Sequence, residues 1–207
     1  MLYLIRHTTP DIAHGICYGQ LDINLSESFE YEVNAVLKLL PALDLVITSP
    51  LQRCKKLAIH LAQERSGRNV SSGHRTAHPS FRNRAGSSPI FRGNAPAALR
   101  VQVDARLMEK HFGAWEGRAW DDIARCEVDA WAADIMGYAP KGGESAQQVL
   151  LRVKTFMQDI TQLHQQNIAL VTHGGTLRAI LALLADIPLT DTLGWEIDYG
   201  AVIGVQL

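Results

Sequence analysis

Short apolar runs alternate with helical patterns along most of this chain, and no other feature restricts its fold as strongly. A short continuous apolar run is typical of a buried strand, whereas apolar residues repeated at i, i+3, i+4 and i+7 indicate an amphipathic helix. Strands are predicted at residues 2–5, 43–48, 101–103, 168–171 and 201–207. Because such alternation is typical of α/β proteins, we expect a three-layer α/β/α sandwich with a mostly parallel central sheet.

Helix start signals support the same layout. Asn24 with Glu27, or Ser26 itself, is expected to cap a helix whose apolar face consists of Phe29, Val33, Val36, Leu37 and Leu40. A capping box of Ser145 and Gln148 opens the clearest helix of the chain. Further helices are predicted at residues 54–61 and 177–184, with a weak helical pattern at residues 120–131 and a break at residues 140–143.

Charge is distributed unevenly along the 207 residues, although the formal net charge is only −1. The segment at about 65–100 contains seven Arg and no Lys, Asp or Glu, and it is rich in Gly, Ser and Pro. It has too few large apolar residues to form a core, so we interpret it as a basic insert in one domain that spans residues 1–207. Near-neutral overall charge disfavours a protein that coats nucleic acid.

The apolar runs and the cysteines of the chain indicate in which compartment the protein is located. No apolar run approaches the roughly 20 residues of a membrane span, and the first residues do not form a signal peptide. Cys17, Cys54 and Cys126 are an odd number without a close pair, which is typical of a reducing compartment. We therefore expect a cytoplasmic protein without a membrane partner, with all three thiols buried or half-buried.

Charged and polar residues lie just beyond four of the predicted strands. They are Arg6, His7 and Thr8 after the first strand, Arg53 after the second, Glu109 after the third, and His173 and Gly174 after the fourth. Ligands of open parallel sheets bind beyond the carboxyl ends of the strands, so these residues are expected to meet in one pocket. Gly174 allows a helix N-terminus to approach a ligand closely and to donate backbone N–H groups to an anion.

These residue types suit the transfer of a phosphoryl group. Arg6 and Arg53 cannot lose their charge, and they can grip a phosphate through paired hydrogen bonds. Neighbouring positive charge disfavours protonation of His7, which leaves a neutral imidazole that can attack phosphorus. Glu109 is then expected to give a proton to the leaving oxygen, and His173 to stabilise the transferring group.

Other phosphate chemistries have different spacings. None of the cysteines is followed six residues later by Arg, and no P-loop, dinucleotide fingerprint or complete nucleophile elbow is present. Metal hydrolysis by His7, His111, His173 and Glu109 stays open, although no His-x-His or His-Glu-x-x-His spacing supports it.

Four motifs resemble those of the histidine phosphatase, or phosphoglycerate-mutase-like, superfamily. They are Leu4-Ile5-Arg6-His7-Thr8, Ser49-Pro50-Leu51-Gln52-Arg53, the run from Leu107 to Gly117, and Val171-Thr172-His173-Gly174-Gly175-Thr176-Leu177-Arg178. The resemblance implies the phosphoglycerate-mutase-like fold, a phosphohistidine on His7, a phosphate pocket of Arg6, Arg53 and His173, and Glu109 as proton donor and acceptor. It implies no metal and no organic cofactor, and a small phosphate ester as the binding partner.

Within this superfamily, the loop from Pro10 to Asp22 is most similar to that of the α-ribazole phosphatases. This resemblance implies hydrolysis of α-ribazole 5′-phosphate in cobalamin biosynthesis by a monomer or homodimer. Further substrate contacts are expected from Thr8, Tyr18, Gln20 and Trp115.

Other functions remain as alternatives. They are a phosphoglycerate mutase, a broad-specificity sugar or nucleotide phosphatase, and a non-catalytic protein that binds an acidic partner through its Arg-rich insert.

Overall fold

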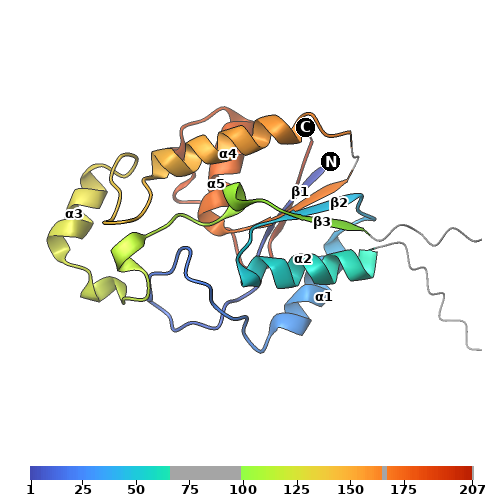
Figure 1. The fold of residues 1–207 in the computed structure, drawn as a ribbon, viewed down its shortest axis with the longest axis horizontal. Coiled ribbons are helices and arrows are strands. Elements are labelled where there is room, and N and C mark those ends of the chain that lie inside the picture. Colours follow the sequence, from blue (N-terminus) through green and yellow to red (C-terminus); the bar gives the residue numbers. More distant parts are fainter. Residues whose placement is uncertain (66–98, 165–166, 207) are drawn as a thin grey trace, which may run out of the picture.

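The computed structural model describes residues 1–65, 99–164 and 167–206, and its centre is a five-stranded sheet (Figure 1). The strands lie in the order β3-β2-β4-β1-β5. Four of them run parallel, and the fifth runs antiparallel to β1; they are β1 (Leu2–Arg6), β2 (Leu45–Thr48), β3 (Arg100–Val103), β4 (Ile168–Thr172) and β5 (Val202–Val205). The predicted mostly parallel sheet is confirmed.

In the described part of the chain, four helices cover the sheet: α1 (Phe29–Leu39), α2 (Gln52–Arg65), α4 (Ala146–Ile160) and α5 (Gly174–Ala185). A further helix, α3 (Arg125–Ala133), lies away from the sheet and packs in an aromatic cluster around Trp115 (Figure 1). Side chains alternate between the two faces of each strand. Leu45 and Ile47 of β2 pack in the cluster that contains α4 and α5, whereas Val46 packs in the cluster that contains α1 and α2. Figure 1 shows these helix pairs on opposite sides of the sheet, which confirms the three-layer sandwich.

The capping box at the start of α4 forms as predicted. The Gln148 backbone N–H donates to Ser145 Oγ at 3.2 Å, and the Ser145 N–H donates to Gln148 Oε1 at 2.8 Å. The expected cap of α1 was wrong, because the helix begins only at Phe29 after Ser28, and Ser28 makes no side-chain cap bond. Ser26 instead uses its Oγ to contact the Ser28 hydroxyl at 2.6 Å.

The weak helical pattern at residues 120–131 resolves into two elements. A 3₁₀ turn spans Trp120–Asp122, and α3 starts only at Arg125. The ring of Trp120 stacks on Trp131 with centroids 5.9 Å apart, inside an aromatic cluster around Trp115. Aromatic packing therefore shapes this segment more than its helical propensity does.

Other expectations are partly met. The basic insert predicted at about 65–100 falls on residues 66–98, which lie outside the described residues. Cys17 and Cys54 are buried as expected, but Cys126, near the start of α3, is exposed. Within the described ranges, no helix combines the length and apolar character that crossing a bilayer requires.

Candidate active site

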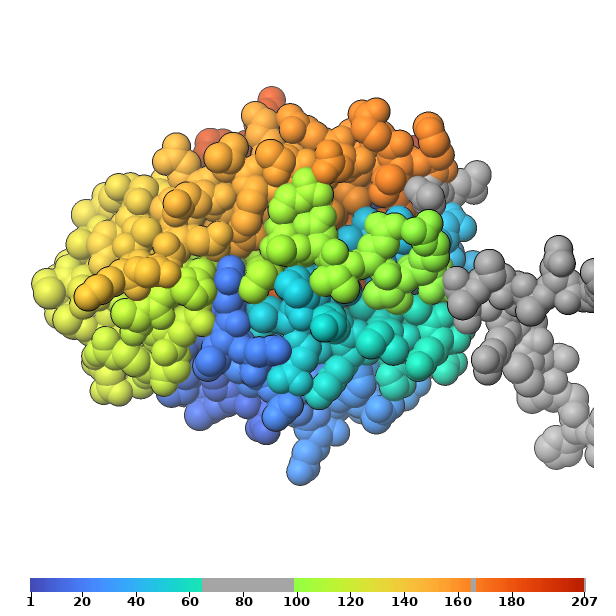
Figure 2. All heavy atoms as spheres, viewed as in Figure 1, coloured from blue at the N-terminus to red at the C-terminus, as the bar shows by residue number. Residues whose placement is uncertain are grey.

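The carboxyl ends of β1, β2 and β4, together with the loop after β3, bring the predicted residues together. A cavity of about 280 Å³ lies there, and Arg6, His7, Arg53 and Glu109 contribute to its wall. His173 lies behind His7, with the two ring centroids 5.1 Å apart. The loop around residue 20 lies between the segment near residue 115 and the start of α2, as Figure 2 shows. Strand order has therefore assembled one pocket from distant parts of the chain.

His7 is held in one orientation by the backbone. Its N–H donates to the Thr172 carbonyl oxygen at 2.9 Å, which continues the β1–β4 pairing. Its Nδ1 lies 2.7 Å from the carbonyl oxygen of Thr8. Because a carbonyl oxygen only accepts hydrogen bonds, Nδ1 carries the proton and Nε2 keeps a lone pair.

Burial keeps the His7 imidazole neutral. The residue is only 2% exposed. Burial lowers its pKa to about 3, and the positive charges of Arg53 and Arg6 act in the same direction. Neighbouring cations were predicted as the cause, but loss of hydration is the larger effect. At neutral pH the Nε2 lone pair is free to react.

The guanidinium groups of Arg6 and Arg53 each have a buried N–H donor that is free to bind a ligand. Arg53 is fully buried, and it donates to the carbonyl oxygens of Leu21 at 2.8 Å and Gly19 at 2.6 Å. Arg6 donates to the Ile197 carbonyl oxygen, and its guanidinium lies 3.8 Å from the centroid of the Tyr199 ring. Within the described part of the chain, the Nε–H groups of both arginines are buried without a partner. An oxyanion between them would satisfy both donors.

His173 and the glycines after it form the start of α5. His173 is fully buried, and its Nε2 lies 2.8 Å from the Ser49 hydroxyl oxygen. Burial also holds the pKa of His173 well below its ordinary value. Gly174 lies against the Arg6 guanidinium, because a Cβ at this position would be in van der Waals contact with Arg6 Nε at 3.4 Å.

Glu109 is fixed against the same helix end. Its Oε2 accepts the Gly175 N–H at 3.0 Å, and its Oε1 accepts the Lys110 N–H at 2.9 Å. A Cβ at position 175 would stand 2.4 Å from Oε1, which is closer than atoms can approach. Glycine at this position is therefore what lets the carboxyl group reach the pocket.

The four residues predicted as further substrate contacts have different surroundings. Tyr18 lines the cavity and its hydroxyl lies 2.5 Å from that of Tyr199, whereas Thr8 is fully buried and contacts His7 through its carbonyl oxygen. Gln20 does not line the cavity, because its Nε2 donates to the Glu109 carbonyl oxygen at 2.9 Å.

Trp115 does not line the cavity either. It is fully buried in the aromatic cluster, where its Nε1–H donates to Glu127 Oε2 at 2.5 Å. Its neighbour in that cluster, Trp131, forms part of the cavity wall instead.

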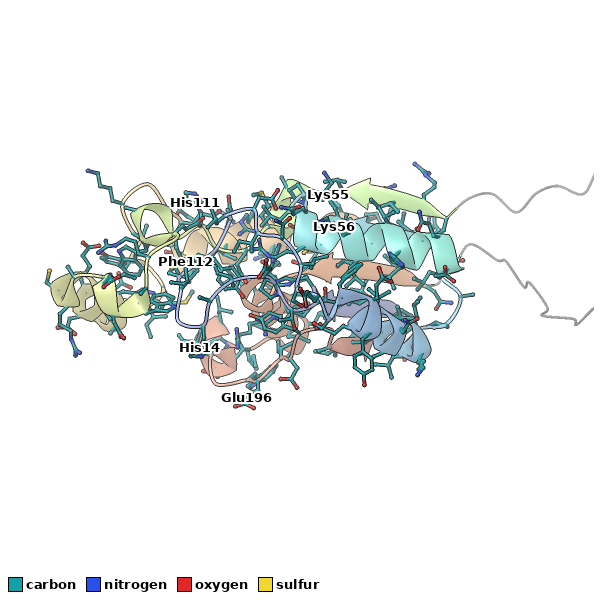
Figure 3. All side chains as sticks on the ribbon, turned by 90° about the horizontal axis from the view of Figure 1, so that it is seen from below. His14, Lys55, Lys56, His111, Phe112 and Glu196 are labelled. Carbon is teal, nitrogen blue, oxygen red and sulfur yellow. The ribbon has the colours of Figure 1, made fainter. Side chains whose placement is uncertain are left out.

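Most of the cavity wall beyond the phosphate-binding end was not predicted from the sequence. This part is largely apolar but includes two cations, and it consists of Lys110, Phe112, Trp131, Ile135, Ala146, Val149, Arg178, Leu189 and Leu193. Lys110 follows Glu109 directly, and Arg178 lies one turn after Gly174 on α5. Their closeness in sequence to predicted site residues is the signal that could have identified them as part of the cavity wall. Figure 3 labels Phe112 on the loop that follows β3.

Across residues 1–65, 99–164 and 167–206, no group of three or more His, Cys, Asp or Glu side chains is placed to hold a metal ion.

Comparison with known proteins extends the similarity over the whole fold. The putative phosphoserine phosphatase 2 of Hydrogenobacter thermophilus is 24% identical over 212 residues, which cover 100% of this chain and 89% of that protein. The adenosylcobalamin/alpha-ribazole phosphatase of Escherichia coli is 32% identical over 113 residues, which cover 53% of this chain and 56% of that protein. The crystal structure of the alpha-ribazole phosphatase from Shigella flexneri shares the fold, with a TM-score of 0.76 at 24% identity over 97% of this chain and 87% of that one.

A family profile also matches most of the chain. The profile described as histidine phosphatase superfamily (branch 1) matches residues 2–74 and 88–207. That match includes all four sequence motifs and every element that builds the pocket. The chain therefore belongs to the histidine phosphatase superfamily, branch 1, and is an enzyme of the phosphatase class.

Proposed function

We propose that this enzyme hydrolyses small phosphate monoesters in two steps, through a phosphohistidine on His7. The observation that carries the proposal is the neutral, buried imidazole of His7 beside two guanidinium groups whose Nε–H donors have no partner within the described residues. The lone pair of His7 can attack the phosphorus of a bound phosphate ester, and the two Nε–H groups can donate hydrogen bonds to its oxygens.

In the first step His7 Nε2 attacks phosphorus and forms the P–N bond. The ester P–O bond breaks, its electron pair stays on the leaving oxygen, and Glu109 supplies the proton that this oxygen takes up. Arg6 and Arg53 hold the equatorial phosphoryl oxygens. His173 supports the position of His7 through their edge-on ring contact.

In the second step water replaces the alcohol. The Glu109 carboxylate takes a proton from water, the water oxygen attacks phosphorus, and the P–N bond breaks with its electron pair returning to Nε2. Glu109 therefore ends the cycle protonated, as it began. Each carboxyl oxygen of Glu109 accepts one backbone N–H, which leaves a lone pair on each oxygen free to take up a proton.

Two substrate classes have support from different observations. α-Ribazole 5′-phosphate is supported by the similarity of the Pro10 to Asp22 loop and by the Escherichia coli relative. A phosphorylated hydroxy acid is supported by the relative named as a phosphoserine phosphatase and by the cations Lys110 and Arg178 in the cavity wall. A mutase would use the same pocket and return the phosphoryl group to a sugar acid.

The test is a comparison of kcat/KM for α-ribazole 5′-phosphate, phosphoserine, 3-phosphoglycerate and p-nitrophenyl phosphate, measured by phosphate release. We expect release from at least one ester, loss of turnover in His7→Ala, and an acid-labile phosphoprotein that this variant does not form. Activity should be unchanged by a chelator. Isomerisation of 3-phosphoglycerate without phosphate release would identify a mutase, and activity lost to a chelator and restored by a divalent cation would contradict the mechanism.

A further inference from the structure

The proton donor Glu109 lies on a segment without regular secondary structure. Residues 108–112 follow the 3₁₀ turn Ala105–Leu107 and belong to no helix or strand. Side chains from other elements hold this segment by its backbone; the Thr176 hydroxyl, for example, donates to the Met108 carbonyl oxygen at 2.7 Å. The position of the Glu109 carboxyl group therefore depends on residues that lie far away in the sequence.

Arg152 of α4 makes the most extensive of these contacts. Its Nη1 donates to the Arg106 carbonyl oxygen at 2.7 Å, and its Nη2 donates to the Glu109 carbonyl oxygen at 3.1 Å. The Gln20 Nε2 donates to the same Glu109 oxygen at 2.9 Å, so both lone pairs of that oxygen have a donor. One guanidinium group thus holds the main chain both at the proton donor and just before it.

Glu144 fixes the guanidinium of Arg152. The Arg152 Nε donates to Glu144 Oε1 at 3.0 Å and its Nη2 donates to Oε2 at 3.1 Å, which is the paired geometry of a strong ion pair. The two side chains are only 17% and 24% exposed, so solvent screens them weakly. Glu144 Oε2 also accepts the His111 N–H at 3.0 Å. The ion pair therefore holds the segment on both sides of Glu109.

We propose that Arg152 is a positioning residue for Glu109, which fixes the main chain so that the carboxyl group meets the leaving oxygen. Neither Arg152 nor Glu144 belongs to the cavity wall, so both can act on a substrate only through the residues that they hold. Proton transfer requires hydrogen-bond distance, and a misplacement of about 1 Å can cost about 100-fold in rate. The proposal rests on the proposed function and adds a residue to the same site.

The test compares two esters of similar shape, phenyl phosphate and p-nitrophenyl phosphate. Phenolate is the poorer leaving group, so its release depends more on the proton from Glu109. Because kcat/KM ends at release of the phenol, the later hydrolysis of the phosphohistidine does not enter it. We expect Arg152→Gln to lower kcat/KM about 10-fold to 100-fold for phenyl phosphate and less than about 3-fold for p-nitrophenyl phosphate.

Two further measurements separate positioning from a general loss of structure. When Glu109 is already replaced by Gln, adding Arg152→Gln should lower kcat/KM for phenyl phosphate by less than about 2-fold more, because the two residues act as a unit. The inhibition constant of inorganic phosphate should change less than about 2-fold in Arg152→Gln, because Arg6 and Arg53 hold the anion.

The matched control is Arg125→Gln. Arg125 lies on α3 outside the cavity wall, and it pairs with Asp129 at 2.7 Å as an exposed ion pair. Its replacement should change kcat/KM for either ester by less than about 2-fold, since exposed pairs contribute little.

A second variant keeps the test decisive if Arg152→Gln does not fold. Arg152→Lys retains the positive charge opposite Glu144, but its single nitrogen cannot bridge the carboxylate and two carbonyl oxygens. We expect it to fold and to slow phenyl phosphate at least about 3-fold more than p-nitrophenyl phosphate.

The outcomes distinguish this proposal from the proposed function. If the Arg152 variants slow both esters equally or not at all, or if their losses multiply with that of Glu109→Gln, the assignment of Arg152 is wrong and the proposed function stands. If Glu109→Gln itself slows both esters equally, the acid role in the proposed function is wrong, and the assignment of Arg152 is wrong with it.

Discussion

Acid should destabilise the native protein through His7, and the structure gives the size of the effect. In the unfolded chain the imidazole titrates at its ordinary pKa of 6.5, whereas burial lowers the pKa in the native state to about 3. Between these values only the unfolded state binds the proton. The contribution of neutral His7 to stability is therefore complete above pH 6.5 and is lost progressively as the pH falls toward 3. At about 1.4 kcal/mol per pH unit, going from pH 7 to pH 5 costs about 2 kcal/mol.

The assay is urea unfolding at pH 7 and pH 5 for the wild type and for His7→Asn. Asparagine keeps a donor for the Thr8 carbonyl oxygen but does not titrate, so the variant should lose about 2 kcal/mol less of its unfolding free energy than the wild type. His173 contributes to both proteins and cancels in the comparison. His164→Asn, at an exposed position, is the control and should behave as the wild type does. An equal loss in wild type and His7→Asn would mean that His7 accepts a proton near its ordinary pKa in the native state, which would refute the neutral nucleophile.

Three further expectations concern the site and the thiols. Gly175→Ala should displace the Glu109 carboxyl group, because the new Cβ would stand 2.4 Å from Oε1, and it should lower kcat about 100-fold or more, whereas Gly194→Ala, with nothing within 4 Å, should change kcat less than about 2-fold. Glu109→Gln should slow alkyl phosphates far more than p-nitrophenyl phosphate, since a good leaving group needs no proton; equal slowing would argue against the acid role. Cys126 should react with Ellman's reagent in the native protein, while burial raises the pKa of the other two thiols and should delay their reaction until unfolding; two fast thiols would contradict this assignment.

Local signals were sufficient for most of the fold. β2 and β4 are buried along their whole length, so each stands out as a short continuous apolar run. The start of α4 was predictable because its capping box lies within four consecutive residues. The start of α1 was not, because several polar residues near Ser26 offered equivalent caps, and the choice among them depends on the packing of the preceding loop.

The phosphate-binding end of the pocket was also predictable. Arg6, His7, Arg53 and Glu109 follow strands or begin helices, and the carboxyl ends of parallel strands must meet. The apolar wall was not predictable in the same way. Trp115 and Trp131 are both aromatic residues after β3, and only the packing of their loop decides which is buried in the cluster and which faces the cavity.

The sequence by itself determined the layered α/β fold, the residues that meet at the strand ends, and the superfamily whose motifs they form. These properties depend on residue type and local spacing, which the chain carries before it folds. Only the tertiary structure decided that His7 is neutral mainly through burial, that Gly175 makes room for Glu109, and that Trp131 rather than Trp115 lines the cavity. These properties depend on how much water and charge surround each group, and segments far apart in sequence supply that environment only after the chain has folded.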